Sequence, residues 1–149
     1  MGKTDGMTLL HATCVSLNRN GVLLRGPSGA GKSDLALQLI DSGARLVADD
    51  YVKLSADNGR LVAATPHTIR GLLEVRGVGV LEVPALSSVL VKLVVDLVTT
   101  GDIPRLPDPG SEVLEGVSIP RITLMSREAS AAAKIRLALT ATQSHIRTV

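Results

Sequence analysis

The chain has 149 residues, the usual size of one domain, and 45% of them are hydrophobic, which is enough for a single core. Trp and Phe are absent and Tyr51 is the one tyrosine, so few side chains can stack on bases, which argues against a single-stranded nucleic-acid binder. The 16 basic and 14 acidic residues are interspersed and give a formal net charge of +2, too small to predict binding to DNA or a membrane.

The amino-terminal residues do not predict a targeting segment. Residues 1–6 are polar, and the apolar run at 7–10 is too short for a signal sequence. No apolar run approaches the roughly eighteen residues of a membrane span. The lone cysteine, Cys14, cannot form an internal disulfide and lies in an apolar stretch, which favours a buried thiol in a reducing compartment. We therefore expect a soluble, cytoplasmic protein.

Short apolar runs separated by Gly, Asp, Asn or Pro favour strands over most of the chain. Turn residues at 18–21 and 57–59 predict hairpins, so the first strands should be antiparallel. Strands are expected near residues 9–17, 22–25, 46–48, 52–54, 61–64, 78–83 and 89–98.

Only residues 32–41 and 129–142 have the apolar periodicity and residue types of helices. So few helices predict an α/β protein that tends toward the α+β class, with a mixed sheet curled around the first helix. Residues 99–120 contain several prolines and glycines and predict a long, mobile loop, which could act as a lid. One domain is expected over residues 1–149.

A phosphate-binding loop is the strongest motif. The octapeptide Gly26-Pro27-Ser28-Gly29-Ala30-Gly31-Lys32-Ser33 fits G-x-x-x-x-G-K-[ST] between a predicted strand and a predicted helix. Its glycines let backbone N–H groups approach phosphate, Lys32 supplies a positive charge, and the Ser33 hydroxyl can hold Mg²⁺. The alternative is a glycine-rich turn joining strand and helix, but such a turn has no need of the Lys-Ser pair.

Two adjacent carboxylates, Asp49 and Asp50, end the predicted strand that follows this helix. One can face Mg²⁺ while the other orients a hydroxyl and takes its proton, which is the main side-chain chemistry that phosphoryl transfer needs. The alternative is a solvated turn or a helix cap.

Several other polar residues are candidates with simpler explanations. His11 could be a half-buried strand residue, and Glu74 with Arg76 could form a surface ion pair. Four basic residues could meet phosphate charge or simply lie in solvent: Arg105, Arg121, Arg127 and Lys134.

In chain order, four elements together resemble the catalytic, carboxy-terminal domain of the HPr kinase/phosphorylase family, in a short form similar to α-proteobacterial members. The resemblance runs from His11 to about Arg136. It implies a P-loop-containing mixed sheet like that of phosphoenolpyruvate carboxykinase and HPr kinase, a missing amino-terminal domain and assembly into hexamers. The four elements are His11, the phosphate loop, Leu46-Val47-Ala48-Asp49-Asp50 and Glu74-Val75-Arg76-Gly77-Val78-Gly79-Val80.

The resemblance also implies an activity: phosphorylation of a serine on the phosphocarrier HPr of the phosphotransferase system by Mg²⁺ and ATP, or often pyrophosphate. Many members also reverse the modification with phosphate. Asp49 would be the general base, Lys32 would hold phosphate, and His11 and Arg76 would complete the catalytic group. Ser33, Asp50 and Glu74 would form the metal side of the site.

One element departs from the family pattern, which has Lys/Arg-x-Gly-Arg in a loop that contacts the protein substrate or a neighbouring subunit. Here Arg127-Glu128-Ala129-Ser130 keeps only the first basic residue, and Lys134 is a candidate to compensate. Two alternatives therefore stay open: a P-loop kinase of a small metabolite, with residues 99–120 as its lid, and a nucleotide-sensing module without turnover.

Overall fold

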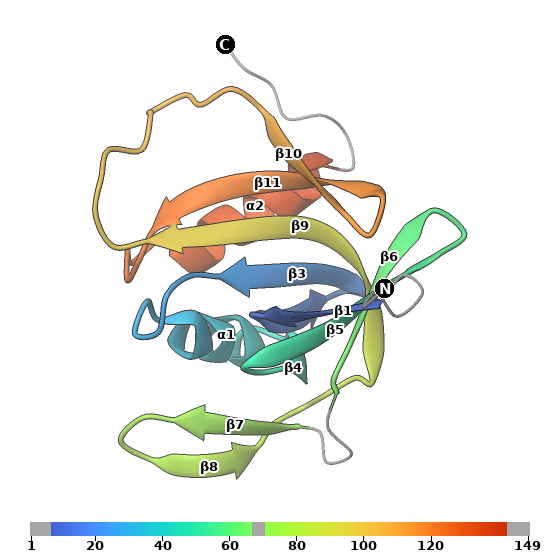
Figure 1. Cartoon of the computed structure of the whole chain (residues 1–149). Coiled ribbons are helices and arrows are strands. Elements are labelled where there is room, and N and C mark those ends of the chain that lie inside the picture. The colour runs from blue at the N-terminus through green and yellow to red at the C-terminus, as the bar shows by residue number, and fades with distance from the viewer. Residues whose placement is uncertain (1–6, 67–70, 143–149) are drawn as a thin grey trace.

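The structure, a computed structural model, describes residues 7–66 and 71–142. Within these ranges it contains eleven strands and two helices, arranged as a mixed α/β fold (Figure 1). In chain order they are β1 (Met7–His11), β2 (Thr13–Leu17), β3 (Asn20–Arg25), α1 (Lys32–Asp41), β4 (Arg45–Ala48), β5 (Tyr51–Asp57), β6 (Arg60–Ala64), β7 (Leu72–Val75), β8 (Gly79–Glu82), β9 (Ser88–Val98), β10 (Gly110–Leu114), β11 (Val117–Met125) and α2 (Ala131–Thr142).

The long strand β9 organises the main sheet. It pairs in parallel with β3 on one edge and with β11 on the other, while its first residues pair antiparallel with β6 (Figure 1). The nine-stranded sheet runs β1-β5-β6-β9-β3-β2-β4, and β10 and β11 join it through β9. β7 and β8 form a separate two-stranded sheet.

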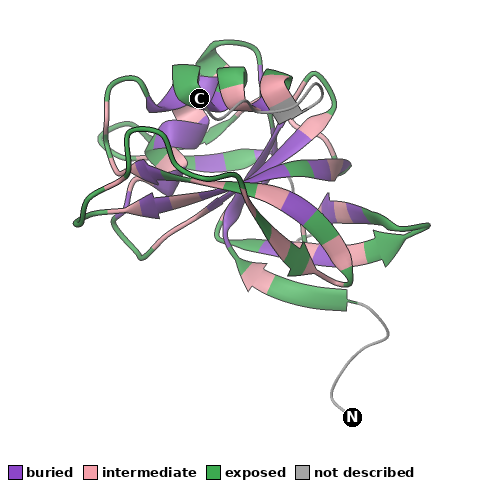
Figure 2. Cartoon of the chain, turned by 90° about the horizontal axis from the view of Figure 1, so that it is seen from above, coloured by how far each residue is buried: buried purple, intermediate pink, exposed green. Residues whose placement is uncertain are grey.

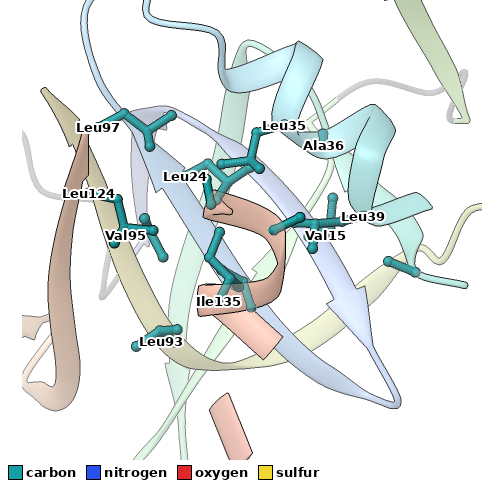
Figure 3. Packing of buried hydrophobic residues seen from close by; sticks show 14 of the residues in the cluster. Val15, Leu24, Leu35, Ala36, Leu39, Leu93, Val95, Leu97, Leu124 and Ile135 are labelled. Atoms are coloured by element: carbon teal, nitrogen blue, oxygen red, sulfur yellow. The ribbon is translucent and has the colours of Figure 1, made fainter. Parts of the chain in front are cut away.

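Neighbouring side chains of a strand point to opposite faces of the sheet, and in the central strands both faces are buried. On β3, Leu24 packs in the cluster beneath the two helices, whereas Leu23 packs in a second cluster on the other face. Figure 3 shows Leu35 of α1 and Ile135 of α2 gathered with Leu24 in the first cluster. In contrast, the edge strand β1 is largely exposed (Figure 2).

Several expectations are confirmed. The first helix covers residues 32–41 as predicted, and the second begins two residues later than predicted, at Ala131. The two predicted hairpins join β2 to β3 and β5 to β6. Both turn on left-handed residues, Asn18 and Arg19 in the first and Asn58 and Gly59 in the second.

Cys14 is fully buried, as predicted. Burial raises the pKa of its thiol to about 12. A protonated, enclosed thiol acts here as a small hydrophobic side chain.

The prediction of one strand over residues 9–17 is wrong. The chain breaks at Ala12 into β1, which pairs with β5, and β2, which pairs with β3 and β4. The backbone N–H of Ala12 donates to the carbonyl oxygen of Asp50 at 3.0 Å instead of joining either ladder. This contact is tertiary, so the apolar pattern carries no sign of it.

The prediction of an irregular loop over residues 99–120 is also wrong in its second half. Residues 110–114 form β10 and pair with β11, and the hairpin turns at Glu115 and Gly116, both left-handed. Pro120 is tolerated in β11 because pairing with β9 begins only at Arg121. Residues 99–109 lie outside regular strands and helices, and their mobility stays a prediction. The strand β7 was likewise not predicted.

Candidate active site

A cleft of about 460 Å³ lies at the amino-terminal end of α1 and collects residues from widely separated parts of the chain. Its lining includes every predicted catalytic and metal-side residue. It also includes Arg127 from the second half of the chain. The lining residues are His11, Thr13, Ser28, Gly29, Gly31, Lys32, Ser33, Asp34, Leu37, Asp49, Asp50, Glu74, Val75, Arg76 and Arg127.

The phosphate loop has the backbone its glycines were expected to provide. Gly29 and Gly31 have φ of 83° and 89°, a region that favours glycine. Gly31 caps α1 without a side-chain hydrogen bond, so the N–H groups of the first turn and the positive helix end are available to an anion.

Three members of the octapeptide are not among the residues that line the cleft: Gly26, Pro27 and Ala30. A Cβ at Gly26 would lie 2.9 Å from the carbonyl oxygen of Leu97, so only glycine fits against β9. Ala30 is fully buried, and its N–H donates to the Pro27 carbonyl at 3.0 Å. The loop is therefore fixed to the sheet behind it.

Lys32 lies inside the loop. Its side chain is nearly buried, and Nζ donates to the carbonyl oxygens of Gly26 at 2.6 Å and Pro27 at 3.2 Å. These bonds use two of the three N–H donors of the ammonium group and place its positive charge beside the loop, as phosphate binding requires.

Asp49 accepts two hydroxyl hydrogen bonds at one oxygen. Thr13 Oγ1 donates to Oδ1 at 2.9 Å, and Ser33 Oγ donates to the same oxygen at 3.1 Å. The carboxylate that ends β4 is thus joined to the first turn of α1. The structure pairs Ser33 with Asp49, and the grouping of Ser33 with Asp50 at a metal stays a prediction.

Asp50 forms a tight corner between β4 and β5. Its φ of 70° is left-handed, a conformation that costs a non-glycine residue about 1 to 3 kcal/mol. The corner is held by the Ala12 bond to the Asp50 carbonyl and by the Tyr51 N–H, which donates to the Asp49 carbonyl at 2.8 Å. The side chain of Asp50 is exposed at the cleft.

Glu74 and Arg76 form the opposite wall. Leu73 is fully buried under α1, so the alternation of β7 turns Glu74 the other way, to the cleft. Arg76 follows the end of β7 and also lines the cleft. No ion pair joins these two described residues, so the simpler explanation as a surface ion pair is wrong.

Of the four other basic candidates, only Arg127 lines the cleft. It has a left-handed φ of 61°, and the preceding Ser126 hydroxyl donates to the Ala30 carbonyl of the phosphate loop. Lys134 forms an ion pair with Glu128 at 2.9 Å and does not line the cleft, so its predicted compensation has no support from its position. Arg105 is exposed away from the cleft.

Arg121 belongs to a charge network at the base of the loop. Arg25, directly before Gly26, donates to Asp96 of β9 and to Glu112 of β10, and Arg121 also contacts both carboxylates. Hydrogen bonds from Arg25, and then from Arg121, lower the pKa of Glu112. Bonds to Glu112 and then Asp96 raise the pKa of Arg25. The network ties the strand that feeds the phosphate loop to β9 and β10.

The cleft suits a magnesium nucleotide. Its oxygen donors from Ser33, Asp49, Asp50 and Glu74 are of the type that Mg²⁺ prefers. Within the described residues, no three His, Cys, Asp or Glu side chains gather as a metal cluster.

Sequence reasoning missed Thr13, Asp34 and Leu37 in the lining. The alternation expected for one strand over residues 9–17 would have put Thr13 on the same face as His11, although the chain in fact breaks between them at Ala12. None of the described helices is long and apolar enough to cross a membrane.

Comparison with known proteins identifies similar chains. The family model described as HPr Serine kinase C-terminal domain matches residues 4–138. An HPr kinase/phosphorylase of Clostridium tetani is 43% identical over 99 residues, 66% of this chain and 32% of the relative. One from Limosilactobacillus reuteri is 38% identical over 127 residues, 77% of this chain and 40% of the relative. The matches to these curated relatives therefore span well under half of the relatives' length.

A solved structure gives a similar result. The HPr(Ser) kinase/phosphatase from Coxiella burnetii superposes with a TM-score of 0.79 at 27% identity, covering 91% of this chain and 96% of that one. The match supports the mixed sheet with few helices that the sequence predicted.

Proposed function

The chain belongs to the family of HPr serine kinase C-terminal domains, and from this premise we propose that it is an ATP- and Mg²⁺-dependent protein-serine kinase acting on an HPr-type phosphocarrier. The named relatives and the solved neighbour support the reaction class. Because the chain spans only part of the curated relatives, the activity, the substrate and the partner are all part of the proposal.

The observation that carries the proposal is the position of Asp49. Its Oδ1 is held by Thr13 and by Ser33 of the phosphate loop, beside a loop built for phosphates. No described residue donates a hydrogen bond to Oδ2, so this oxygen can accept the proton of a serine hydroxyl that enters the cleft. Positioning of the hydroxyl supplies most of the rate in this chemistry.

The other charged and polar residues of the cleft have separate roles in the proposed reaction. Lys32 and the N–H groups of the loop would bind the phosphates, while Arg76, Arg127 and His11, which also line the cleft, would meet the acceptor. The oxygens of Ser33, Asp50 and Glu74 would hold Mg²⁺. When bound, the magnesium nucleotide supplies the phosphoryl group and neutralises its charge.

The family resemblance extends the proposal further. We include use of pyrophosphate as a donor, reversal of the reaction with inorganic phosphate, assembly into hexamers and a cytoplasmic location.

A transfer assay tests the proposal. Purified protein is incubated with γ-labelled ATP, Mg²⁺ and the HPr-type carrier of its own organism, and label should appear on a carrier serine. Asp49→Asn should lower the rate by about a hundredfold or more while ATP still binds. The same assay is then run with pyrophosphate and reversed with phosphate.

Two outcomes would contradict the proposal. Consumption of ATP with a metabolite panel, with no label on the carrier, would point to a small-molecule kinase. ATP binding without turnover, equal in wild type and Asp49→Asn, would point to a nucleotide sensor.

A further inference from the structure

Three successive residues at the break between β1 and β2 contact the corner that carries the two aspartates. The His11 ring lies 5.3 Å from the Tyr51 ring, and the Ala12 N–H donates to the Asp50 carbonyl at 3.0 Å. Thr13 Oγ1 donates to Asp49 Oδ1 at 2.9 Å. Of these three contacts, only that of Thr13 reaches a carboxylate.

Thr13 is only 1% exposed, yet it lines the cleft. A hydrogen bond from a buried hydroxyl to a carboxylate is charge-assisted and competes little with water. Ser33, on α1, donates to the same oxygen as Thr13, on β2, so two separate elements hold one carboxylate oxygen. Two donors at Oδ1 fix the rotation of the carboxylate and thereby direct Oδ2.

We propose that Thr13 is a positioning residue for phosphoryl transfer, whose hydroxyl holds Asp49 in the orientation that lets Oδ2 accept the serine proton. The inference rests on the proposed function of Asp49. Thr13 itself touches no reacting atom in this arrangement, and it acts only through Asp49.

The simpler explanation is that a buried hydroxyl bonds to whichever acceptor lies nearest, without consequence for the reaction. Ser16 supplies a matched control on the same strand. It is 2% exposed, and its hydroxyl has no hydrogen-bond partner among the described residues. This strand therefore accommodates a buried hydroxyl without a partner, so the Thr13 bond is not a general requirement of β2.

Steady-state kinetics of carrier phosphorylation test the proposal. Thr13→Val keeps the shape and removes the donor, and it should lower kcat about tenfold while the KM for ATP changes less than about twofold. Thr13→Ser keeps the donor and should recover most of kcat. Ser16→Ala should match the wild type. Equal kcat in Thr13→Val and wild type, or a loss that Thr13→Ser does not recover, would overturn the proposal.

A second measurement needs no activity and so separates this inference from the proposed function. In urea unfolding, Thr13→Val should lower the midpoint in the wild-type background and leave it unchanged or higher in Asp49→Ala, where the hydroxyl has lost its acceptor. An equal decrease in both backgrounds would show that the hydroxyl does not act through Asp49. Thr13→Ala is measured alongside and tests the same bond if valine does not fit.

If the wild type labels no carrier, the proposed function fails. The unfolding cycle still decides whether Thr13 holds Asp49. If the carrier is labelled and the cycle shows no coupling, only the role of Thr13 fails.

Discussion

The two walls of the cleft are built differently. The phosphate wall rests on the buried centre of the sheet: Gly26 lies against β9, Ala30 is fully buried, and Lys32 is bonded to two loop carbonyls. The opposite wall is the β7–β8 hairpin, which lies apart from the main sheet (Figure 1). Leu73 is its fully buried anchor, while Val78 and Val80 are 68% and 64% exposed.

Phosphate binding and acceptor binding place different demands on a fold. A phosphate site needs backbone N–H groups held in place, which the core provides. On the hairpin, Glu74 and Arg76 are themselves exposed, while Leu73 and Val75 pack against the core. Substitutions in the phosphate wall should therefore change stability and activity together, and substitutions on the hairpin surface should change activity alone.

The largest effect is expected at the hairpin anchor. Leu73→Ala should lower the free energy of unfolding by about 2 to 5 kcal/mol, because it leaves a cavity in the cluster under α1. Denaturant unfolding measures the change. Leu72→Ala, on the same strand but 42% exposed, is the control and should cost less than about 1 kcal/mol.

The next effect compares one cation from each wall. Lys32→Met should weaken ATP binding about tenfold or more and also destabilise the fold, because two loop carbonyls lose their donor. Arg76→Met should lower carrier phosphorylation yet change the free energy of unfolding by less than about 0.5 kcal/mol, since Arg76 is exposed. Calorimetric ATP titration, the carrier-labelling assay and denaturant unfolding of both variants check this. Equal destabilisation would remove the distinction between the walls.

A smaller, pH-dependent effect is expected at the charge network behind the phosphate wall. Folding lowers the pKa of Glu112, so its contribution is present above the unfolded value of about 4.3 and is lost as pH falls through the lower folded value. Glu112→Gln should cost about 1 to 2 kcal/mol at pH 7. The difference from wild type should shrink progressively below about pH 4. Unfolding measured across pH tests this, and a constant difference would contradict it.

The smallest effect is expected on the outer surface of the hairpin. Val80→Thr should leave the free energy of unfolding within about 0.5 kcal/mol of wild type, because the side chain is mostly exposed. A loss above about 1 kcal/mol in thermal unfolding would mean that this surface is covered in solution.

Local signals made much of the site predictable. Gly29, Gly31 and Lys32 act within one loop, and residues 32–41 carry their own helical periodicity, so sequence spacing alone places them. The Asp pair was predictable as a strand end. The hairpin at 110–125 was not, because its prolines and glycines resemble those of a loop and its pairing depends on β9.

Other features depend on residues far apart in the chain. The role proposed for Thr13 depends on its hydrogen bond to Asp49, which lies 36 residues away in the sequence. The break at Ala12 likewise depends on its hydrogen bond to Asp50. A pattern read along β1 and β2 cannot contain either partner. The role of Asp49 as general base and that of Asp50 at the metal also stay predictions, and Ser33 contacts only Asp49 by hydrogen bond.

The pairing of β3 with β9 also affects when the phosphate loop can form during synthesis on the ribosome. The strand that feeds the phosphate loop ends at Arg25, but its parallel neighbour spans Ser88–Val98, and the carbonyl of Leu97 fills the space behind Gly26. Parallel pairing at such separation forms late in folding. A nascent chain stalled before residue 98 should therefore hold the complete loop sequence and still lack the support that shapes it, so nucleotide retention by stalled chains should begin only after β9 has emerged.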